Sequence, residues 1–387
     1  MRSAERIDKL PPYLFAELDK KVAAAKAKGV DVISFGIGDP DRPTPQHIVD
    51  AGIRELSDPA NHQYPSYYGL AELREAIAAY YERRFNVALD PKTQVLPLIG
   101  SKEGIAHLAT AFVDPGEAVL VQDPGYPVYR TATMLSGGRP ISVPLTAGEN
   151  FVPQLDRIPA GDVNVSKVLW INFPSNPTSA VCDEGFMKTA VDFCATNDLL
   201  LAHDAAYVEL TYDGYTAPSV LQAPGALDVA VEFGSLSKTY NMTGWRVGWV
   251  VGSTQAIEAI GRVKTNIDSG IFNAIQKAGV TALEGPQDCI QENIEVYRRR
   301  RDLVVDALRA AGLKVDAPLG AIYVWVPVPD GHNSVSFCQH LLDEAGVVVA
   351  PGSGYGSHGE GFVRFSLTLA DDRVTEGMER VTKALET

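Results

Sequence analysis

The sequence predicts an α/β protein with a mostly parallel sheet and a second, smaller α+β domain. Between residues 48 and 275, short apolar runs alternate with longer stretches of helical periodicity, which is typical of a parallel sheet covered on both faces. From residue 286 onward, one long helical stretch is followed by strands and shorter helices. A chain of 387 residues is long enough for both domains.

The first elements are a helix and a short strand. Residues 14–28 have an amphipathic pattern that ends at Gly29, residues 33–35 form a strand, and the proline-rich turn 40–45 leads into the next helix. We expect the strands of the large domain at the apolar runs 95–99, 118–122, 168–172, 199–203, 229–233 and 247–251.

The C-terminal part is predicted to contain a helix over 286–311, a helix over 335–345, a closing helix, and strands at 322–326, 347–350 and 362–367. The expected division is an N-terminal arm with part of the small domain in 1–45, a large domain in 46–285 and a small domain in 286–387.

The composition excludes several classes of function. A net charge of −14 disfavours nucleic acid or an anionic membrane surface as partner. The N-terminus lacks the apolar core of a signal peptide and no run approaches membrane-spanning length, so we expect a cytoplasmic protein. The four cysteines are far apart and suggest reduced thiols. The seven histidines show no ligand spacing, so no metal is expected.

The most informative stretch is 235–246, Ser-Leu-Ser-Lys-Thr-Tyr-Asn-Met-Thr-Gly-Trp-Arg. A lysine that reacts as a free amine needs a site that disfavours ammonium. The hydroxyls of Ser235 and Ser237 and the guanidinium of Arg246 suit a phosphate dianion beside Lys238. Together they describe an anchor for pyridoxal 5'-phosphate, whose aldehyde bonds to lysine. A lysine among serines is, taken alone, more often a solvated surface residue.

Other positions support this cofactor. Asp204 ends the apolar run 199–203 and can pair with a protonated pyridine nitrogen, the alternative being a helix cap. Tyr207 and Asn176 can donate hydrogen bonds to the phenolic oxygen of the ring. Residues 100–102, Gly-Ser-Lys, follow an apolar run and open a helix, whose N-terminal N–H groups favour phosphate.

The order of these motifs resembles the class I/II aminotransferases, pyridoxal-phosphate enzymes of the aspartate aminotransferase fold. The shared motifs are Gly100-Ser101-Lys102, Asp123-Pro124-Gly125-Tyr126-Pro127, Asn176-Pro177-Thr178, Asp204-Ala205-Ala206-Tyr207, Lys238 with Arg246, and Arg364. The resemblance covers essentially the whole chain and implies fold type I of the pyridoxal-phosphate-dependent transferases, with a seven-stranded sheet in the large domain.

More narrowly, the chain resembles the LL-diaminopimelate aminotransferase subgroup, which acts in lysine biosynthesis. The stretches that carry this are 35–41, 64–67, 100–107 and 239–246. The resemblance implies transfer of an amino group between LL-2,6-diaminopimelate and 2-oxoglutarate. Aspartate-, alanine- or N-succinyldiaminopimelate-type aminotransferases remain alternatives, and a lyase or decarboxylase on the same scaffold is an alternative of another class.

By the resemblance, Lys238 bonds to the cofactor and moves the substrate proton, and Asp204 keeps the pyridine nitrogen protonated. Tyr207 and Asn176 contact the ring oxygen, and Tyr126 stacks on the ring, although a packed core tyrosine is a rival interpretation. The phosphate ligands are then Ser101, Lys102, Ser235, Ser237 and Arg246, with Tyr64 of the partner subunit in a homodimer.

The substrate is expected near Arg364, which interrupts an apolar strand and suits bidentate capture of an α-carboxylate; a structural ion pair is the alternative. Gly38 lets the backbone approach that carboxylate closely. The resemblance to the subgroup implies that Lys102 also reaches the far end of the substrate, and Tyr13 and Asn273 match subgroup positions near it. No separate acidic residue near 64–69 is available for a distal ammonium.

Two further motifs have simpler explanations. The run 298–301, four arginines, lies within helical reach of Glu292, Glu295 and Asp302, so we expect a solvated face rather than an anion site. Residues 354–359 match Gly-x-Gly-x-x-Gly, but a strand follows instead of a helix. These are therefore expected to be turn glycines rather than a dinucleotide site.

Overall fold

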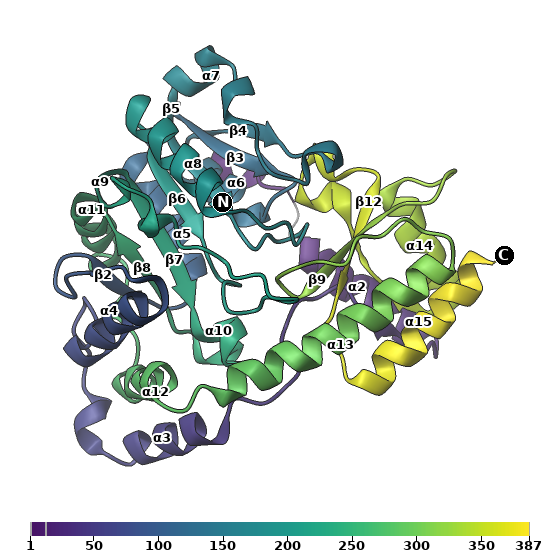
Figure 1. Ribbon diagram of the computed structural model, residues 1–387, viewed down its shortest axis with the longest axis horizontal. Helices are drawn as coiled ribbons and strands as arrows, with labels where there is room; N and C mark the ends of the chain where they lie inside the picture. The colour runs from purple at the N-terminus through teal and green to yellow at the C-terminus, as the bar shows by residue number, and fades with distance from the viewer. Residues whose placement is uncertain (1, 12–13, 387) are drawn as a thin grey trace.

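The computed structural model describes residues 2–11 and 14–386 and contains a large and a small domain (Figure 1). The large domain is built on a seven-stranded sheet in the order β2-β8-β7-β6-β5-β3-β4. The strands from β7 to β4 are parallel, whereas β8 is antiparallel to both of its neighbours. The strands are β2 (Val95–Leu98), β3 (Ala118–Asp123), β4 (Arg139–Pro144), β5 (Ser166–Asn172), β6 (Leu200–Asp204), β7 (Ala230–Ser235) and β8 (Gly248–Gly252).

This arrangement confirms the predicted mostly parallel seven-stranded sheet, but strand β4 was not located in the sequence. It lies at the edge, pairs with β3 alone and contains Pro140 and Pro144. Proline cannot donate a hydrogen bond to a ladder and is tolerated at sheet edges. Most of its residues are partly exposed, so the apolar run that marks the other strands is missing.

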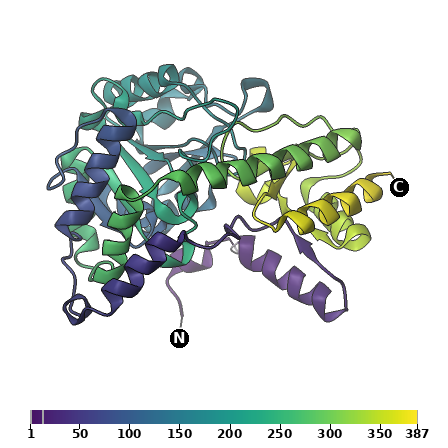
Figure 2. The same cartoon turned by 60° about the horizontal axis from the view of Figure 1, so that its bottom comes forward.

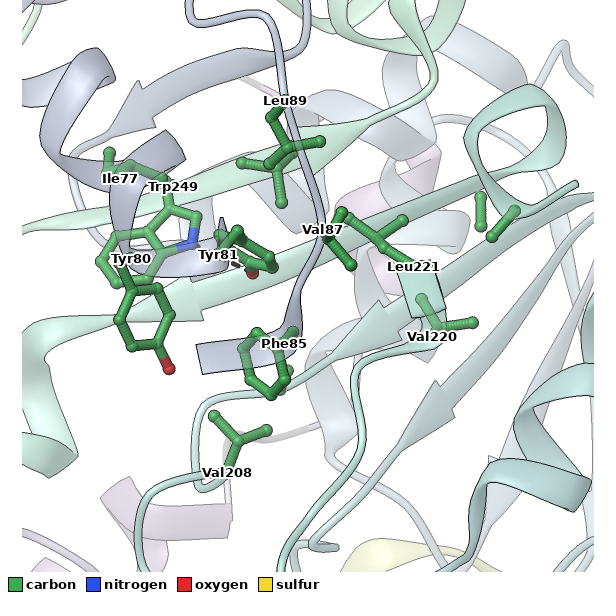
Figure 3. Packing of buried hydrophobic residues seen from close by; sticks show 14 of the residues in the cluster. Ile77, Tyr80, Tyr81, Phe85, Val87, Leu89, Val208, Val220, Leu221 and Trp249 are labelled. Atoms are coloured by element: carbon green, nitrogen blue, oxygen red, sulfur yellow. Dashed lines mark hydrogen bonds between the residues drawn. The ribbon is translucent and has the colours of Figure 1, made fainter. Parts of the chain in front are cut away.

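Both faces of the large sheet are buried. Along β5, Leu169 and Ile171 belong to one hydrophobic core, while Val168 and Trp170 belong to the core on the other face, as the two-residue period of a strand requires. Aromatic residues of α4 pack over β8: Tyr80 meets Tyr81 and Trp249 edge-on, with ring centroids 5.4 and 5.9 Å apart (Figure 3).

The sheet is covered by helices that the alternating pattern predicts. They are α3 (Gln46–Leu56), α4 (Ala71–Phe85), α5 (Ser101–Phe112), α6 (Pro127–Leu135), α7 (Ala160–Asn164), α8 (Glu184–Thr196), α9 (Ala226–Val229), α10 (Leu236–Thr239), α11 (Thr254–Lys264) and α12 (Asn273–Glu284). Within residues 2–11 and 14–386, no helix has both the length and the apolar character needed to cross a membrane.

The small domain has a three-stranded antiparallel sheet, β11-β12-β9. Its elements are β9 (Tyr323–Pro327), β11 (Ala350–Pro351), β12 (Phe362–Ser366), α13 (Asp288–Ala310), α14 (Ser334–Ala345) and α15 (Asp371–Leu385). The glycine-rich residues 354–359 lie in 3-10 turns before β12, as predicted.

The predicted strand over 347–350 is wrong as a single element. Residues of β10 (Val347–Val348) pair in parallel with β1 (Ile33–Ser34), while β11 begins at Ala350 and pairs with β12. The N-terminal segment therefore joins the small domain: α2 (Leu14–Ala27) lies beside it in Figure 2, and Val22 and Ala25 pack with Val348. The short helix α1 (Glu5–Asp8) precedes α2.

The prediction of a solvated face at the arginine run 298–301 is wrong for two of the four residues. Arg300 and Arg301 are buried rather than part of a solvated face. Arg300 donates to Asp41 at 2.7 and 2.9 Å and to Asp371 at 2.7 Å, and Arg301 donates to Asp213 at 2.6 Å. Helix α13, which runs between the two domains in Figure 1, thereby holds three other segments. Partners distant in the sequence, which helical spacing does not reveal, determine this burial.

We expect Arg300→Ala to destabilise the fold. It leaves the carboxylates of Asp41 and Asp371 without their shared buried partner, which costs about 2–4 kcal/mol of unfolding free energy. Urea denaturation followed by circular dichroism measures the loss. Arg299→Ala is the matched control: this neighbour also pairs with Asp371 but is half-exposed, so its removal costs under about 1 kcal/mol. Equal losses would contradict the assignment.

Candidate active site

A cavity of about 370 Å³ lies at the carboxyl ends of β5, β6 and β7, beside the N-terminus of α5. In open parallel sheets, ligands bind at the carboxyl ends of the strands. Predicted site residues that line it are Gly38, Ser101, Lys102, Tyr126, Asn176, Asp204, Tyr207, Ser235, Ser237, Lys238 and Arg246. The remaining lining residues, which the sequence did not reveal, are Ile37, Asp39, Asn172, Ala206, Thr243 and Tyr323.

Lys238 lies in the short helix α10 that follows β7, so its amine points into the cavity from the sheet edge. Its Nζ donates to the backbone oxygen of Gly38 at 2.7 Å. Burial lowers the pKa of Lys238 to about 8, with the charges of Arg364 and Arg246 acting in the same direction and Asp39 opposing them. A substantial fraction of this amine is therefore neutral near pH 8, as a nucleophile or base requires.

Asp204 is the last residue of β6 and is buried. Its Oδ2 accepts a hydrogen bond from the Tyr129 hydroxyl at 2.7 Å. Burial raises the pKa of Asp204, while the Tyr129 hydroxyl, the charge of His203 and the Ala206 N–H favour its ionised form. The other oxygen, Oδ1, is buried and accepts no well-formed hydrogen bond from the described residues. A protonated pyridine nitrogen would provide the missing donor.

The opposite end of the cavity suits a phosphate. Gly100 has a φ of 75° and precedes the twelve-residue helix α5, whose first N–H groups have no partner within the helix. A Cβ at this glycine would lie 2.1 Å from Arg246 Nη2, so only glycine allows the guanidinium to approach. Ser235 Oγ accepts from the Ser237 N–H at 3.1 Å, and Arg246 Nη1 donates to Thr243 O at 2.8 Å.

Arg364, on β12, lies behind the cavity wall and is fully buried. It donates to Asn176 Oδ1 at 2.7 Å and to Gly36 O at 2.8 Å, and its guanidinium lies 4.0 Å from the Tyr323 ring centroid. Because Asn176 uses its oxygen for Arg364, its NH₂ group is the donor that remains for the cavity. Both of these hydrogen bonds are to neutral oxygens.

Tyrosines and an asparagine complete the site. The hydroxyl of Tyr207 lies 2.8 Å from that of Tyr323. The pKa of Tyr207 is raised well above its ordinary value, mainly because the side chain is buried. Asn172 donates to the backbone oxygen of Asp204 at 2.7 Å and accepts from the Asn176 N–H at 2.7 Å. The ring of Tyr126 meets that of Tyr129 edge-on, with the ring centroids 5.6 Å apart. Asn172 is the last residue of β5 and pairs with Asp204, so its place at the end of an apolar strand is the sequence signal that could have predicted it as a site residue.

Some predicted residues lie elsewhere. Tyr64 is 85% exposed and Asn273 donates to Gln63 O at 3.4 Å, so the two segments are neighbours outside the cavity of their own chain. Tyr13 lies outside the described residues.

A cluster of possible metal ligands lies near α5. Acceptor atoms of Glu103, His107 and Asp268 are within 4.8 Å of one another. The Nζ of Lys264 already lies 2.9 Å from Glu103 and 2.7 Å from Asp268. The ammonium group of Lys264 thus pairs with both carboxylates, and the cluster is a partly buried ion-pair network.

The fold and the cavity define a pyridoxal-phosphate-dependent enzyme: a lysine with a lowered pKa lies between a buried carboxylate and a phosphate-type site. The family model of class I and II aminotransferases matches residues 30–381, and the chain belongs to this family. It is 55% identical to an LL-diaminopimelate aminotransferase of Desulforudis audaxviator, over 99% of this chain and 97% of that one.

Solved structures agree. Substrate-bound BacF of Bacillus subtilis has a TM-score of 0.95 and 32% identity, covering 99% of this chain and 98% of that one. A mutant of Thermus thermophilus aspartate aminotransferase has a TM-score of 0.93 and 29% identity, covering 99% and 100%. These likenesses confirm the predicted aspartate aminotransferase fold.

The chemistry is that of an aminotransferase. When bound, the cofactor withdraws electrons from the substrate α-carbon and carries the amino group between the two substrates. The geometry fits Lys238 as the group that holds the cofactor and then moves the α-proton, since its amine is buried and close to neutral. Asp204 can orient the ring nitrogen, and Asn176 and Tyr207 can hold the ring oxygen. Arg364 lies behind the part of the cavity wall that contains Asn176, and from there it can attract the substrate carboxylate.

The pKa of about 8 predicts how apoenzyme captures its cofactor. Below this pH the Lys238 amine is protonated and cannot attack the aldehyde. The rate constant for covalent capture should therefore rise about tenfold per pH unit up to about 8 and then level off. Stopped-flow absorbance during reconstitution measures it. In Lys238→Ala, non-covalent binding should be flat over the same range, and a capture rate without a break near pH 8 would contradict the prediction.

Proposed function

We propose that the protein transfers an amino group between LL-2,6-diaminopimelate and 2-oxoglutarate, a reaction of lysine biosynthesis. The observation that carries this is the full-length identity of 55% to a protein of that name. The match covers 99% of this chain and 97% of that protein, so it includes both domains and is not confined to the cofactor motifs.

The charges of the cavity support the same substrate. Diaminopimelate has a carboxylate and an ammonium group at each end. Arg364 suits the carboxylate near the reacting carbon, and Lys102, which lines the cavity, suits the far one. Asp39 is the one carboxylate besides Asp204 among the described lining residues, and it is exposed to the cavity. It can accept the distal ammonium for which the sequence showed no partner near residues 64–69.

The alternatives differ in that ammonium group. Aspartate and alanine do not have it, and N-succinyldiaminopimelate carries an uncharged amide in its place. None of them would gain from Asp39. Aspartate-type activity is supported by the likeness to the Thermus enzyme, but the identity there is 29%. A lyase or decarboxylase would release product without an amino acceptor.

Asp39→Asn therefore tests the substrate. It should raise the KM for LL-diaminopimelate about tenfold, because a charge-assisted hydrogen bond to the ammonium is lost, and leave the KM for glutamate within about twofold. Steady-state assays with both amino donors measure the two values. Lys102→Gln is the matched variant for the distal carboxylate. Activity on alanine or aspartate alone, with diaminopimelate inert, would refute the proposed substrate and leave the family assignment intact.

We also propose a homodimer with shared active sites. Tyr64 is exposed and, with Asn273, lies outside its own cavity, as residues that complete a partner's site would. A cytoplasmic location is consistent with the four cysteines, which are all free thiols.

Mixing two defective variants tests the shared site. Tyr64→Phe should weaken cofactor binding, and Lys238→Ala should be inactive. After subunit exchange, half of the dimers would be hybrids with one intact site, so activity should recover to about a quarter of the unmutated level. Activity at limiting cofactor concentration measures this recovery. Sedimentation of a fully active monomer, or no recovery after verified exchange, would contradict the proposal.

A further inference from the structure

A histidine and a glutamate form a fully buried pair beneath the cofactor site. His203 on β6 and Glu232 on β7 are cross-strand partners, both with no exposed surface, and His203 Nδ1 lies 2.9 Å from Glu232 Oε2. His203 immediately precedes Asp204, so its side chain lies on the opposite face of the sheet from that carboxylate. No step of the aminotransferase chemistry described above uses this pair.

Hydrogen bonding determines the charge of both groups. Besides His203, Glu232 accepts from the Tyr81 hydroxyl at 2.9 Å, the Ser219 hydroxyl at 2.8 Å and the Val220 N–H at 2.9 Å. Tyr81 and Val220 lie on the face covered by α4 (Figure 3). Three donors other than His203 therefore already point at this carboxyl group, which leaves it an acceptor toward the imidazole.

The histidine faces acceptors on both sides. Its Nδ1 faces the Glu232 carboxylate, and its Nε2 lies 3.1 Å from the backbone oxygen of Phe173. A neutral imidazole has one donor and one acceptor nitrogen and would leave one of these contacts as two facing lone pairs. Only the imidazolium satisfies both, and Glu232 supplies its counter-charge.

Two cofactor-binding groups depend on this imidazolium. Its positive charge favours the ionised form of Asp204, whose burial acts in the opposite direction. Through Phe173 O it also holds the chain that follows β5, which leads to Asn176. Asn176 in turn receives Arg364. The His203 imidazolium therefore acts on two groups of the site. It stabilises the charge of Asp204, the partner of the ring nitrogen, and it holds the segment that carries Asn176, the partner of the ring oxygen.

We propose that His203 is a positioning residue that remains an imidazolium throughout the reaction, keeps Asp204 ionised and holds the Asn176 segment in place. Glu232 is its obligatory counter-ion. The pair acts on the cofactor through Asp204 and does not touch substrate, so its effect is the same for every amino donor.

The charge of His203 is measured directly by NMR of holoenzyme with ¹⁵N-labelled histidine. At about pH 8.5, two units above the ordinary histidine pKa of about 6.5, both ring nitrogens of His203 should still have the chemical shifts of protonated nitrogen. His203→Gln assigns the signal. A neutral His203 at this pH would overturn the proposal.

The effect on Asp204 is measured with cofactor labelled with ¹⁵N at the pyridine nitrogen. In His203→Gln the ring nitrogen should shift toward its unprotonated value, and cofactor should dissociate about tenfold more readily, as for the loss of one pKa unit of charge stabilisation. Glu232→Gln should do the same, because the histidine loses its counter-ion. Ser219→Ala is the control: it removes a neutral donor from Glu232, so it should lower thermal stability and leave the nitrogen signal unchanged.

The double variant His203→Gln/Glu232→Gln separates electrostatics from folding. It contains no unpaired buried charge, so it should be more stable than His203→Gln alone. The ring nitrogen should nevertheless be as poorly protonated as in the single variant. If the nitrogen signal follows thermal stability across the four variants, or is unchanged in all of them, the pair is merely structural and the proposal is wrong.

Discussion

The buried carboxylate at the end of β6 is the constraint on which the site depends. Asp204 is taken out of water by the sheet and by helix α6, which supplies Tyr129. A carboxylate in such surroundings must be neutralised or find donors. One oxygen accepts from Tyr129, and the other is buried and accepts no well-formed hydrogen bond from the residues that the structure describes. Cofactor binding therefore resolves an electrostatic conflict that folding creates.

The rest of the cavity is built from elements that lie in different parts of the sequence. The phosphate region uses the N-terminus of α5 and the turn after α10, whose close approach requires a glycine at position 100. The cation proposed for the substrate carboxylate is Arg364 of the small domain, which contacts the large domain through Asn176. The Arg364–Asn176 hydrogen bond therefore links the arginine proposed for the substrate carboxylate to the amide proposed for the ring oxygen.

Much of the site could be predicted because its residues follow apolar strands in the sequence. Asp204 and Lys238 each come directly after such a run, and the sheet brings those ends together. Residues whose role depends on a distant partner were missed or misread. The burial of Arg300 requires Asp41 and Asp371, and the role of His203 requires Glu232, contacts that no local spacing reveals. Strand β4 was missed because its prolines and partial exposure disguise an edge strand.

The charge balance of the cavity explains why Arg364 is needed behind its wall. Its lining contains the cations Lys102 and Arg246, the partly neutral amine of Lys238 and the carboxylates Asp39 and Asp204, in a chain of net charge −14. A bound phosphate brings about −2 and makes the local charge negative. An anionic substrate would then be repelled unless another cation acts at close range. Arg364 can provide it: its hydrogen bonds to Asn176 and Gly36 are to neutral oxygens, and its stacking on Tyr323 places the guanidinium next to the cavity without exposing it to water.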